Sequence, residues 1–230
     1  MPEHSAEYYK EGQTLLIDKP KDWTSFNVVN KVRGHLKWAY NIKKIKVGHA
    51  GTLDPLATGL LIICTGKNTK KITQYTGLNK EYFAEIELGV TTPSYDLETE
   101  ADAHYPFEHI TETRLKETLN NFIGKQEQIP PIYSAKNING KRAYKYAREG
   151  KEVEMRPANI EIYELELIKF HLPFAEIRIV CSTGTYIRSL ARDMGLALNS
   201  GARLTDLRRT AIGEFSVNDA IDIDKFEKNA

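Results

Sequence analysis

The chain has few cysteines and no long apolar run, and these absences narrow the classes of protein to which it can belong. Only Cys64 and Cys181 occur in 230 residues, and there is no Cys-x-x-Cys motif. We therefore predict buried free thiols in a reducing compartment rather than a disulfide or a structural zinc site. No apolar run approaches the roughly 20 residues that a membrane-spanning helix needs. Residues 1–12 lack the apolar segment of a signal peptide and are expected to form a flexible tail.

Linkers and nucleotide-binding motifs are also missing. No Pro-, Gly- or Ser-rich stretch and no internal repeat divides the sequence, so we expect one domain over residues 13–230. That length suffices for a sizeable core. The chain has neither a Walker motif nor a dinucleotide fingerprint, and we expect no cofactor and no metal.

Charge is nearly balanced overall but unevenly distributed. Residues 1–80 carry 13 Lys and Arg against 6 Asp and Glu, residues 81–120 carry 2 against 10, and residues 121–160 carry 8 against 4. Such asymmetry indicates a basic face built from separate stretches, as a polyanion would require. Ordinary clustering of surface charge would give the same counts.

Hydrophobic periodicity indicates a mixed α+β fold. Residues 80–88 alternate between an apolar face with Tyr82 and an acidic face, which is typical of a half-exposed strand. Helical spacing is found over 115–122 and 187–198, and Ser25 is expected to cap a helix with Phe26, Val29, Val32 and Leu36 on one face. Further strands are predicted over 14–20, 60–64, 160–170 and 174–181. The order lacks the regular βαβ rhythm of a doubly wound fold, so we predict a largely antiparallel sheet flanked by helices.

Asp54 is the first candidate for chemistry. It lies in the segment GTLDPLATG, residues 51–59, where nearly every neighbour is small or apolar. Pro55 restricts Asp54 to an extended or turn conformation, and a carboxylate in such surroundings needs a positive partner to stay ionised. A turn aspartate that bonds its own backbone is the alternative.

Arg188 can supply the positive partner. It follows a strand that ends near Cys181 and a glycine-bearing turn, and it falls in the first turn of the next helix. Many strand–turn–helix units share this pattern, so a plain surface arginine remains open.

Two stretches have the composition of RNA contacts. Lys43, Lys44 and Lys46 precede the Asp54 segment, and residues 129–148 mix basic and aromatic side chains. Cations that bind phosphates and rings that stack on unpaired bases are combined in readers of single-stranded RNA. A solvated helix, for example over residues 142–149, would show the same pattern.

Six segments in chain order carry a more specific signal. They are residues 17–20, 48–59 (GHAGTLDPLATG), 80–82, 128–135 with 140–144, 184–188 and 207–209. Together they resemble the TruB family of tRNA pseudouridine synthases and span about residues 14–212. The resemblance implies a pseudouridine synthase fold, with a largely antiparallel mixed sheet flanked by helices and loops. It also implies an isomerase that converts the T-loop uridine 55 of tRNA to pseudouridine.

The resemblance carries roles over to matching positions. Asp54 matches the catalytic aspartate, Tyr82 the tyrosine that stacks on the target base, and Arg188 the arginine that pairs with the catalytic carboxylate. Four more residues match substrate-binding positions: His49 in the flipped-out loop, Tyr186 and Leu207 in the uracil pocket, and Lys19, whose motif with Pro20 looks structural. The implied partner is the T-arm stem-loop of tRNA, bound by a cytoplasmic monomer without an obligate protein partner or a membrane.

Two departures from the family pattern are visible. Asn137 stands where relatives often have a lysine, which puts one supporting contact in doubt. The last motif is followed by only about 20 residues, so we expect no C-terminal PUA domain.

Other activities remain open on the residues alone. A non-catalytic RNA-binding or tRNA-folding module would not need Asp54, Tyr82 and Arg188 together. A synthase acting on ribosomal RNA in a guide-RNA complex and a phosphate-ester enzyme using Asp54 are weaker alternatives. For pseudouridine formation, Asp54 can attack C1′ or deprotonate the sugar to give a glycal, and the sequence does not choose between them.

Overall fold

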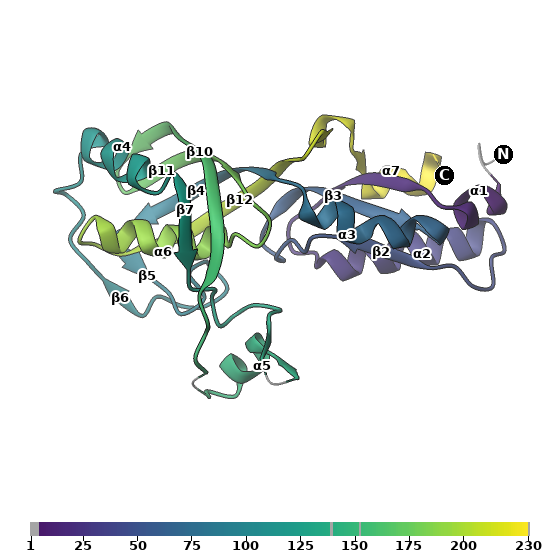
Figure 1. The fold of residues 1–230 in the computed structure, drawn as a ribbon, viewed down its shortest axis with the longest axis horizontal. Helices are drawn as coiled ribbons and strands as arrows, with labels where there is room; N and C mark the ends of the chain where they lie inside the picture. The colour runs from purple at the N-terminus through teal and green to yellow at the C-terminus, as the bar shows by residue number, and fades with distance from the viewer. Residues whose placement is uncertain (1–4, 139, 152, 230) are drawn as a thin grey trace. The chain divides into compact units, whose positions relative to one another are not determined.

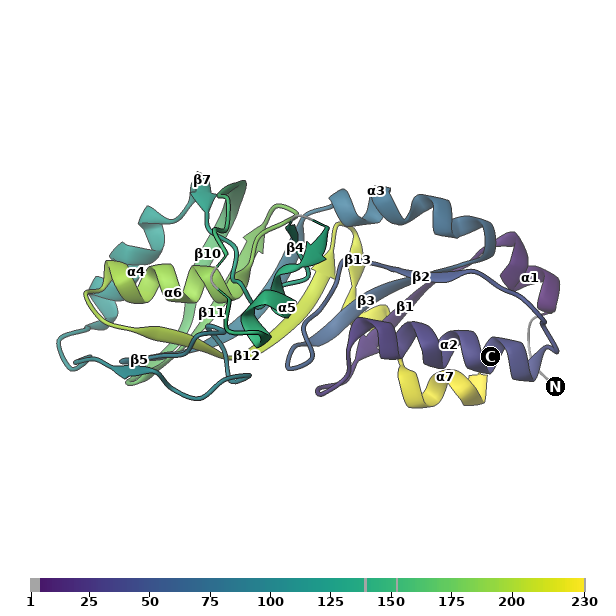
Figure 2. The same ribbon diagram turned by 90° about the horizontal axis from the view of Figure 1, so that it is seen from below.

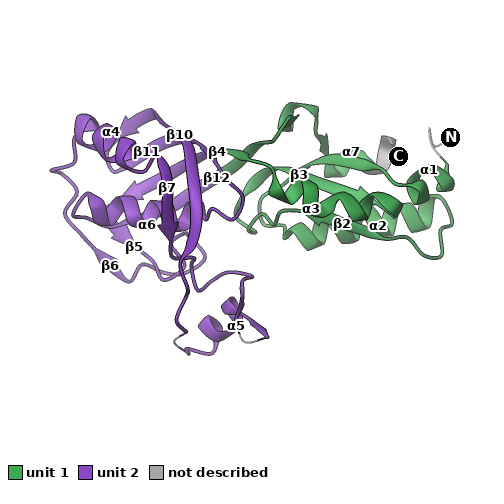
Figure 3. Ribbon diagram, in the orientation of Figure 1, with its two compact units in different colours: residues 1–82, 207–230 green, residues 83–206 purple. Residues whose placement is uncertain are grey.

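The chain forms two compact units in the computed structural model, which describes residues 5–138, 140–151 and 153–229 (Figure 1). Unit 1 combines residues 1–82 with 207–230, and unit 2 comprises residues 83–206 (Figure 3). Strands β4 (Lys80–Leu88) and β12 (Ala202–Ile212) each begin in one unit and end in the other. Each unit therefore contains a segment of both strands.

The sheet of unit 1 has the order β14-β1-β3-β12, with β2 paired to β3 and β13 to β12. Its other strands are β1 (Thr14–Lys19), β2 (Val47–Ala50), β3 (Thr58–Thr65), β13 (Phe215–Ser216) and β14 (Ile221–Asp222). The pairs β1–β14 and β3–β12 are parallel, whereas β1–β3 and β2–β3 are antiparallel. The pair β12–β13 is also antiparallel, and the predicted mixed sheet is thus confirmed.

Helices cover both faces of this sheet, which explains the uninterrupted apolar run of β3. Its odd-numbered residues Leu61 and Ile63 pack against α2 (Ser25–Ala39) and α7 (Ile223–Asn229). The even-numbered Leu60, Ile62 and Cys64 face the other side, toward α3 (Ile72–Gly77), which follows the 3₁₀ helix η1 (Gly66–Lys71). Figure 2 shows α2 and α7 on one face and α3 on the other. A strand buried on both faces has no reason to alternate.

The structure corrects two expectations for the N-terminal part of the chain. Residues 6–11, expected to be a flexible tail, form helix α1 (Ala6–Glu11), because Tyr9 is buried in the core of unit 1. The cap of α2 is Thr24 rather than Ser25, and Phe26 is 60% exposed. Val28 takes the buried place expected for Phe26, since it continues the stripe of Val29, Val32 and Leu36.

Unit 2 has the strand order β4-β11-β10-β7 in its main sheet. Its elements are β5 (Val90–Thr91), β6 (Ala103–His104), α4 (Glu112–Asn121), β7 (Gly124–Gln128), β8 (Asn137–Ile138), β9 (Lys141–Arg142), α5 (Ala143–Arg148), β10 (Ala158–His171), β11 (Phe174–Cys181) and α6 (Ile187–Ala197). Helix α5 and the β8–β9 pair project from the rest of this unit (Figure 1). The apolar residues at helical spacing over 187–198 are all buried, as expected for α6: Ile187, Leu190, Ala191, Met194 and Leu198.

The prediction of buried free thiols is confirmed, because Cys64 and Cys181 are both free and buried. Among the helices of the described residues, none is long and apolar enough to cross a membrane.

Candidate active site

Asp54 lies in the loop of residues 51–57 that joins β2 to β3 in unit 1. The carboxylate is half-buried, and its backbone carbonyl accepts a hydrogen bond from Ala57 N at 3.1 Å. That bond closes a tight turn, in agreement with the small residues and the proline of this segment. Asp54 therefore lies just before the first residue of the buried strand β3, at the N-terminal end of that strand.

Buried side chains hold this loop on both sides of Asp54. The Ser25 hydroxyl accepts a hydrogen bond from Leu53 N at 2.8 Å and donates one to Leu53 O at 3.0 Å. Lys19 Nζ donates to Pro55 O at 3.2 Å, and Arg209 Nη2 donates to Gly51 O at 3.2 Å. The backbone is thus fixed before, beside and after the carboxylate.

Lys19 is fully buried, although the sequence placed it among substrate-binding residues. Besides Pro55 O, its ammonium donates to Pro20 O at 2.8 Å and to Trp23 O at 2.6 Å. Burial lowers the pKa of Lys19 from 10.5 to about 8, against the opposing effect of the negative charges on Asp54 and Asp22. The three N–H donors of the Lys19 ammonium are thus all bound by backbone carbonyls. These contacts agree with a structural role for the motif of Lys19 and Pro20.

His49 and Arg209 are neighbours of the same loop. His49 lies on β2 opposite Ile63 and is half-buried. Burial, followed by the positive charge of Arg209, lowers the pKa of His49, while a hydrogen bond with the Gly51 backbone acts in the opposite direction. The imidazole is therefore neutral at pH 7.

Tyr82 and Leu207 lie on the two strands that pass between the units. Tyr82 on β4 is 8% exposed, and so is Leu207 on β12. Leu207 O accepts a hydrogen bond from Thr58 Oγ1 at 3.5 Å, which ties β12 to the start of β3. Unit 1 therefore contains five of the predicted site residues: Lys19, His49, Asp54, Tyr82 and Leu207.

Arg188 belongs to unit 2 and is buried in the first turn of α6, so the surface alternative is excluded. Its Nε lies 3.5 Å from Asp96 Oδ2, Nη1 donates to Ser94 O at 3.2 Å, and Nη2 donates to Tyr133 O at 2.9 Å. The guanidinium is thus oriented by its own unit. Its pairing with Asp54 stays a prediction.

Tyr186 is the N-cap residue of α6, and the buried Gln128 holds it in place. Tyr186 N donates to Gln128 Oε1 at 2.8 Å, and Gln128 Nε2 donates to Tyr186 O at 3.1 Å. A side-chain amide that accepts from the N–H and donates to the C=O of one residue restrains the backbone on both sides of that residue's Cα. Tyr186 is therefore presented with a defined backbone direction.

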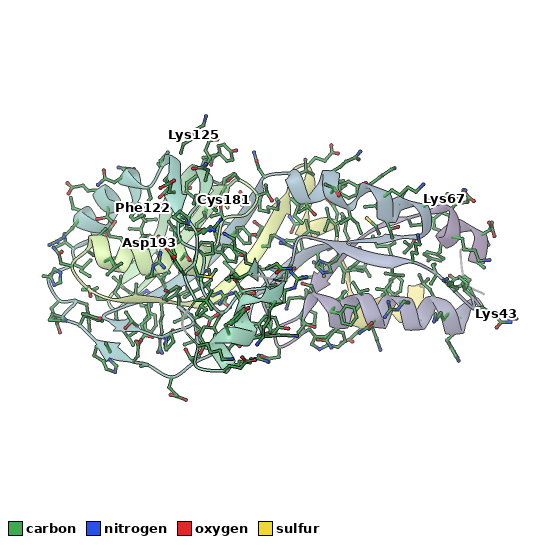
Figure 4. All side chains as sticks on the ribbon, turned by 60° about the horizontal axis from the view of Figure 1, so that its bottom comes forward. Lys43, Lys67, Phe122, Lys125, Cys181 and Asp193 are labelled. Carbon is green, nitrogen blue, oxygen red and sulfur yellow. The ribbon has the colours of Figure 1, made fainter. Side chains whose placement is uncertain are left out.

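Several exposed lysines lie near the C-terminal end of β3, which is the end remote from Asp54. Residue 46 is hydrogen-bonded to Gly66, directly after β3, and Lys43 and Lys67 lie at the same end of unit 1 (Figure 4). We call the exposed lysines of this region the basic end: Lys43, Lys44, Lys46, Lys70 and Lys71. Within the described residues none of them is held in an ion pair, whereas Lys67 is paired with Glu11 at 2.7 Å.

Three residues of these contacts were not predicted as site residues from the sequence: Asp96, Ser25 and Arg209. Arg209 lies in the motif of residues 207–209, but its burial could not be predicted from its residue type, because arginine is rarely buried. Among the described residues, no group of three or more His, Cys, Asp or Glu side chains is placed to hold a metal ion.

Comparison with solved structures identifies the class of fold. The chain superposes with a TM-score of 0.72 on a chain of a Cbf5-Nop10-Gar1 complex, and the two are 26% identical in sequence. The superposition covers 98% of this chain and 56% of the solved one. The chain thus spans little more than half the length of the solved chain. With its mixed sheet flanked by helices, the protein has the pseudouridine synthase fold, as predicted.

Sequence comparison identifies the family. Residues 37–187 match the model of the TruB family pseudouridylate synthase N-terminal domain, and residues 188–230 match that of the tRNA pseudouridylate synthase B C-terminal domain. The chain belongs to the TruB family. It is 56% identical to tRNA pseudouridine synthase B of Phocaeicola vulgatus over 95% of this chain and 93% of the relative. It is 54% identical to the Flavobacterium johnsoniae protein of the same name, over 98% of this chain and 99% of that relative. The chain is therefore an isomerase of the tRNA pseudouridine synthase class.

Proposed function

We propose that the chain isomerises uridine 55 in the T-loop of tRNA to pseudouridine, with Asp54 as the reacting carboxylate. The observation that carries this proposal is the loop of residues 51–57, which presents a half-buried carboxylate on a backbone fixed by Ser25, Lys19 and Arg209. A group that must meet one carbon atom of a sugar benefits from such restraint, because reacting atoms have to be aligned within a fraction of an ångström.

The reaction breaks the N1–C1′ bond, turns the base and forms a C5–C1′ bond, after which C5 loses its proton and the freed N1 takes one up. Asp54 begins it either by attack on C1′ or by removal of a sugar proton. The overall change is an isomerisation, so atoms and electrons balance without an external oxidant or reductant. Arg188, oriented by Asp96, supplies the positive charge that pairs with Asp54 in this proposal.

The target uridine has to leave the stacked T-loop before it reaches Asp54, at a cost of a few kcal/mol. Tyr82 offers an aromatic face for the flipped base, and such stacking contributes about 1–3 kcal/mol. The basic end lies at the far end of the eight-residue strand β3, roughly 25 Å from the Asp54 loop at about 3.3 Å per residue. The T-stem would thus run along unit 1 while its loop reaches Asp54.

The test is a tritium-release assay on a tRNA transcript labelled at C5 of its uridines, under single-turnover conditions. Asp54→Asn should form no product and still bind tRNA within a few-fold of wild type, because the amide keeps the size but is neither a nucleophile nor a base. Product formation by this variant would exclude Asp54 as the reacting group. A transcript with cytidine at position 55 should release no tritium, and release from it would place the target elsewhere.

A further inference from the structure

The contacts of Ser25 are unusual for the first residue of a helix. A serine at a helix start commonly caps the free N–H groups, but in α2 that task belongs to Thr24, whose side chain accepts from Asn27 N. The Ser25 hydroxyl is buried and turned instead to Leu53, the residue directly before Asp54. Both the donor and the acceptor of the hydroxyl are used on that one residue.

Arg209 and Lys19 act on the two flanks of the same loop. Arg209 Nε donates to Leu60 O at 2.8 Å in β3 while Nη2 donates to Gly51 O, so one side chain joins the loop to the strand that follows it. Gly59 has a φ of +103°, and a Cβ there would lie 2.2 Å from Arg209 O. The close approach of β12 to the start of β3, directly after the loop, therefore depends on a glycine. Hydrogen bonds from charged donors such as these are stronger than neutral ones.

We propose that Ser25, with Lys19 and Arg209, is a positioning residue that fixes the backbone on both sides of Asp54 before the RNA binds. The inference rests on the proposed role of Asp54. All three side chains reach the loop through its carbonyl and N–H groups, so they determine where the carboxylate lies without touching the substrate. Their contribution is preorganisation of the reacting group, which affects the rate of the chemical step rather than the affinity for tRNA.

Thr65 provides a matched control in the same unit. Its buried hydroxyl also accepts one backbone hydrogen bond, from Gln13 N at 2.9 Å, and donates another, to Tyr9 O at 2.9 Å. It lies at the end of β3 remote from the Asp54 loop. Thr65→Val and Ser25→Ala therefore remove the same kind of buried hydroxyl with the same two bonds, but only Ser25→Ala releases Leu53.

The experiment compares single-turnover rates and tRNA dissociation constants of wild type, Ser25→Ala and Thr65→Val. We expect Ser25→Ala to lower the rate about 10- to 100-fold, with a dissociation constant within about three-fold of wild type. Thr65→Val should stay within about two-fold of wild type in both. Equal rates for the two variants, or a Ser25→Ala defect that lies in binding alone, would overturn the inference.

Two further arms make the outcome unambiguous. Asp54→Asn is measured in parallel: if it turns over, the proposed function fails, whereas an inactive Asp54→Asn with a fully active Ser25→Ala overturns only the inference. If Ser25→Ala does not fold, Ser25→Cys keeps the shape of the side chain with a slightly larger atom and weakens both hydrogen bonds. Amide exchange at Leu53 then serves as a readout independent of turnover. Exchange should be at least about ten-fold faster in the Ser25 variant than in Thr65→Val, and unchanged protection would contradict the proposed contact.

Discussion

Lys19 is the group whose burial should be visible in the pH dependence of stability. Its ammonium is fully buried, and its pKa lies at about 8 in the folded chain instead of 10.5. Desolvation is the largest cause and lowers the pKa, Asp54, Asp22 and Asp18 raise it, and Arg209 lowers it further. The perturbation is a rise in pH, with Lys19→Met as the reference that lacks the titrating group.

The direction in which the free energy of unfolding changes with pH depends on whether the folded or the unfolded chain holds the proton of Lys19. Below pH 8 Lys19 is charged in both the folded and the unfolded chain. Between about pH 8 and 10.5 the folded chain has released the proton and the unfolded chain has kept it, so the free energy of unfolding rises with pH in this window. One pKa unit corresponds to about 1.4 kcal/mol, so Lys19 contributes roughly 3 kcal/mol over the window and about 2 kcal/mol by pH 9.5.

Equilibrium urea unfolding of wild type and Lys19→Met at pH 7.5 and 9.5 measures this contribution. Groups that titrate in both proteins cancel in the difference between the two free energies of unfolding. That difference should change by about 2 kcal/mol in favour of wild type on going to pH 9.5. A difference constant within about 0.5 kcal/mol would refute the reasoning, because Lys19 would then keep its proton despite its burial.

Two other predictions concern Arg188 and the basic end. Arg188→Lys should lower the single-turnover rate by at least about 100-fold, because a point-charge ammonium cannot contact three separate groups in the plane of a guanidinium. Asp96→Asn should destabilise the chain by about 3 kcal/mol in urea unfolding, since it removes a carboxylate that lies 3.5 Å from the buried guanidinium. A near-normal rate for Arg188→Lys and a near-normal free energy of unfolding for Asp96→Asn would show that the buried pair is unimportant. Replacing Lys43 and Lys44 together by Gln should reduce the slope of log affinity for tRNA against log salt by up to about two and leave the single-turnover rate unchanged. If the salt dependence of tRNA affinity does not change in this variant, the RNA does not contact Lys43 and Lys44.

The fold was largely predictable because its main elements have clear periodicity. The strand over 80–88 and the helix over 187–198 were recognised from alternation and from helical spacing, and both are confirmed. The central strand β12 was not predicted, because arginines interrupt its apolar pattern at positions 203, 208 and 209. These arginines are accommodated by partners distant in sequence, Glu87, Asp18 and Leu60, which periodicity does not reveal.

The candidate site was predictable only where a motif marks it. The segment of residues 51–59 identified Asp54, but Ser25 was expected to be a helix cap, and a serine beside a helix start is equally suited to either task. Asp96 could not be connected with Arg188 from the sequence, because 92 residues separate them and the intervening acidic stretch contains many carboxylates. Long-range polar contacts of this kind follow from the packed fold and not from local pattern.

In the proposed function, the residues that prepare the chemistry are separate from those that bind the RNA. Ser25, Lys19 and Arg209 are buried and engaged with the backbone of the Asp54 loop, so no binding energy from tRNA is needed to order that loop. The basic end is exposed and lies beyond the far end of β3, where its charges can offset the cost of opening the T-loop without disturbing Asp54. Under this proposal, binding energy from the basic end can be used for base flipping at the other end of β3, because the proposed reacting carboxylate, Asp54, is already in place.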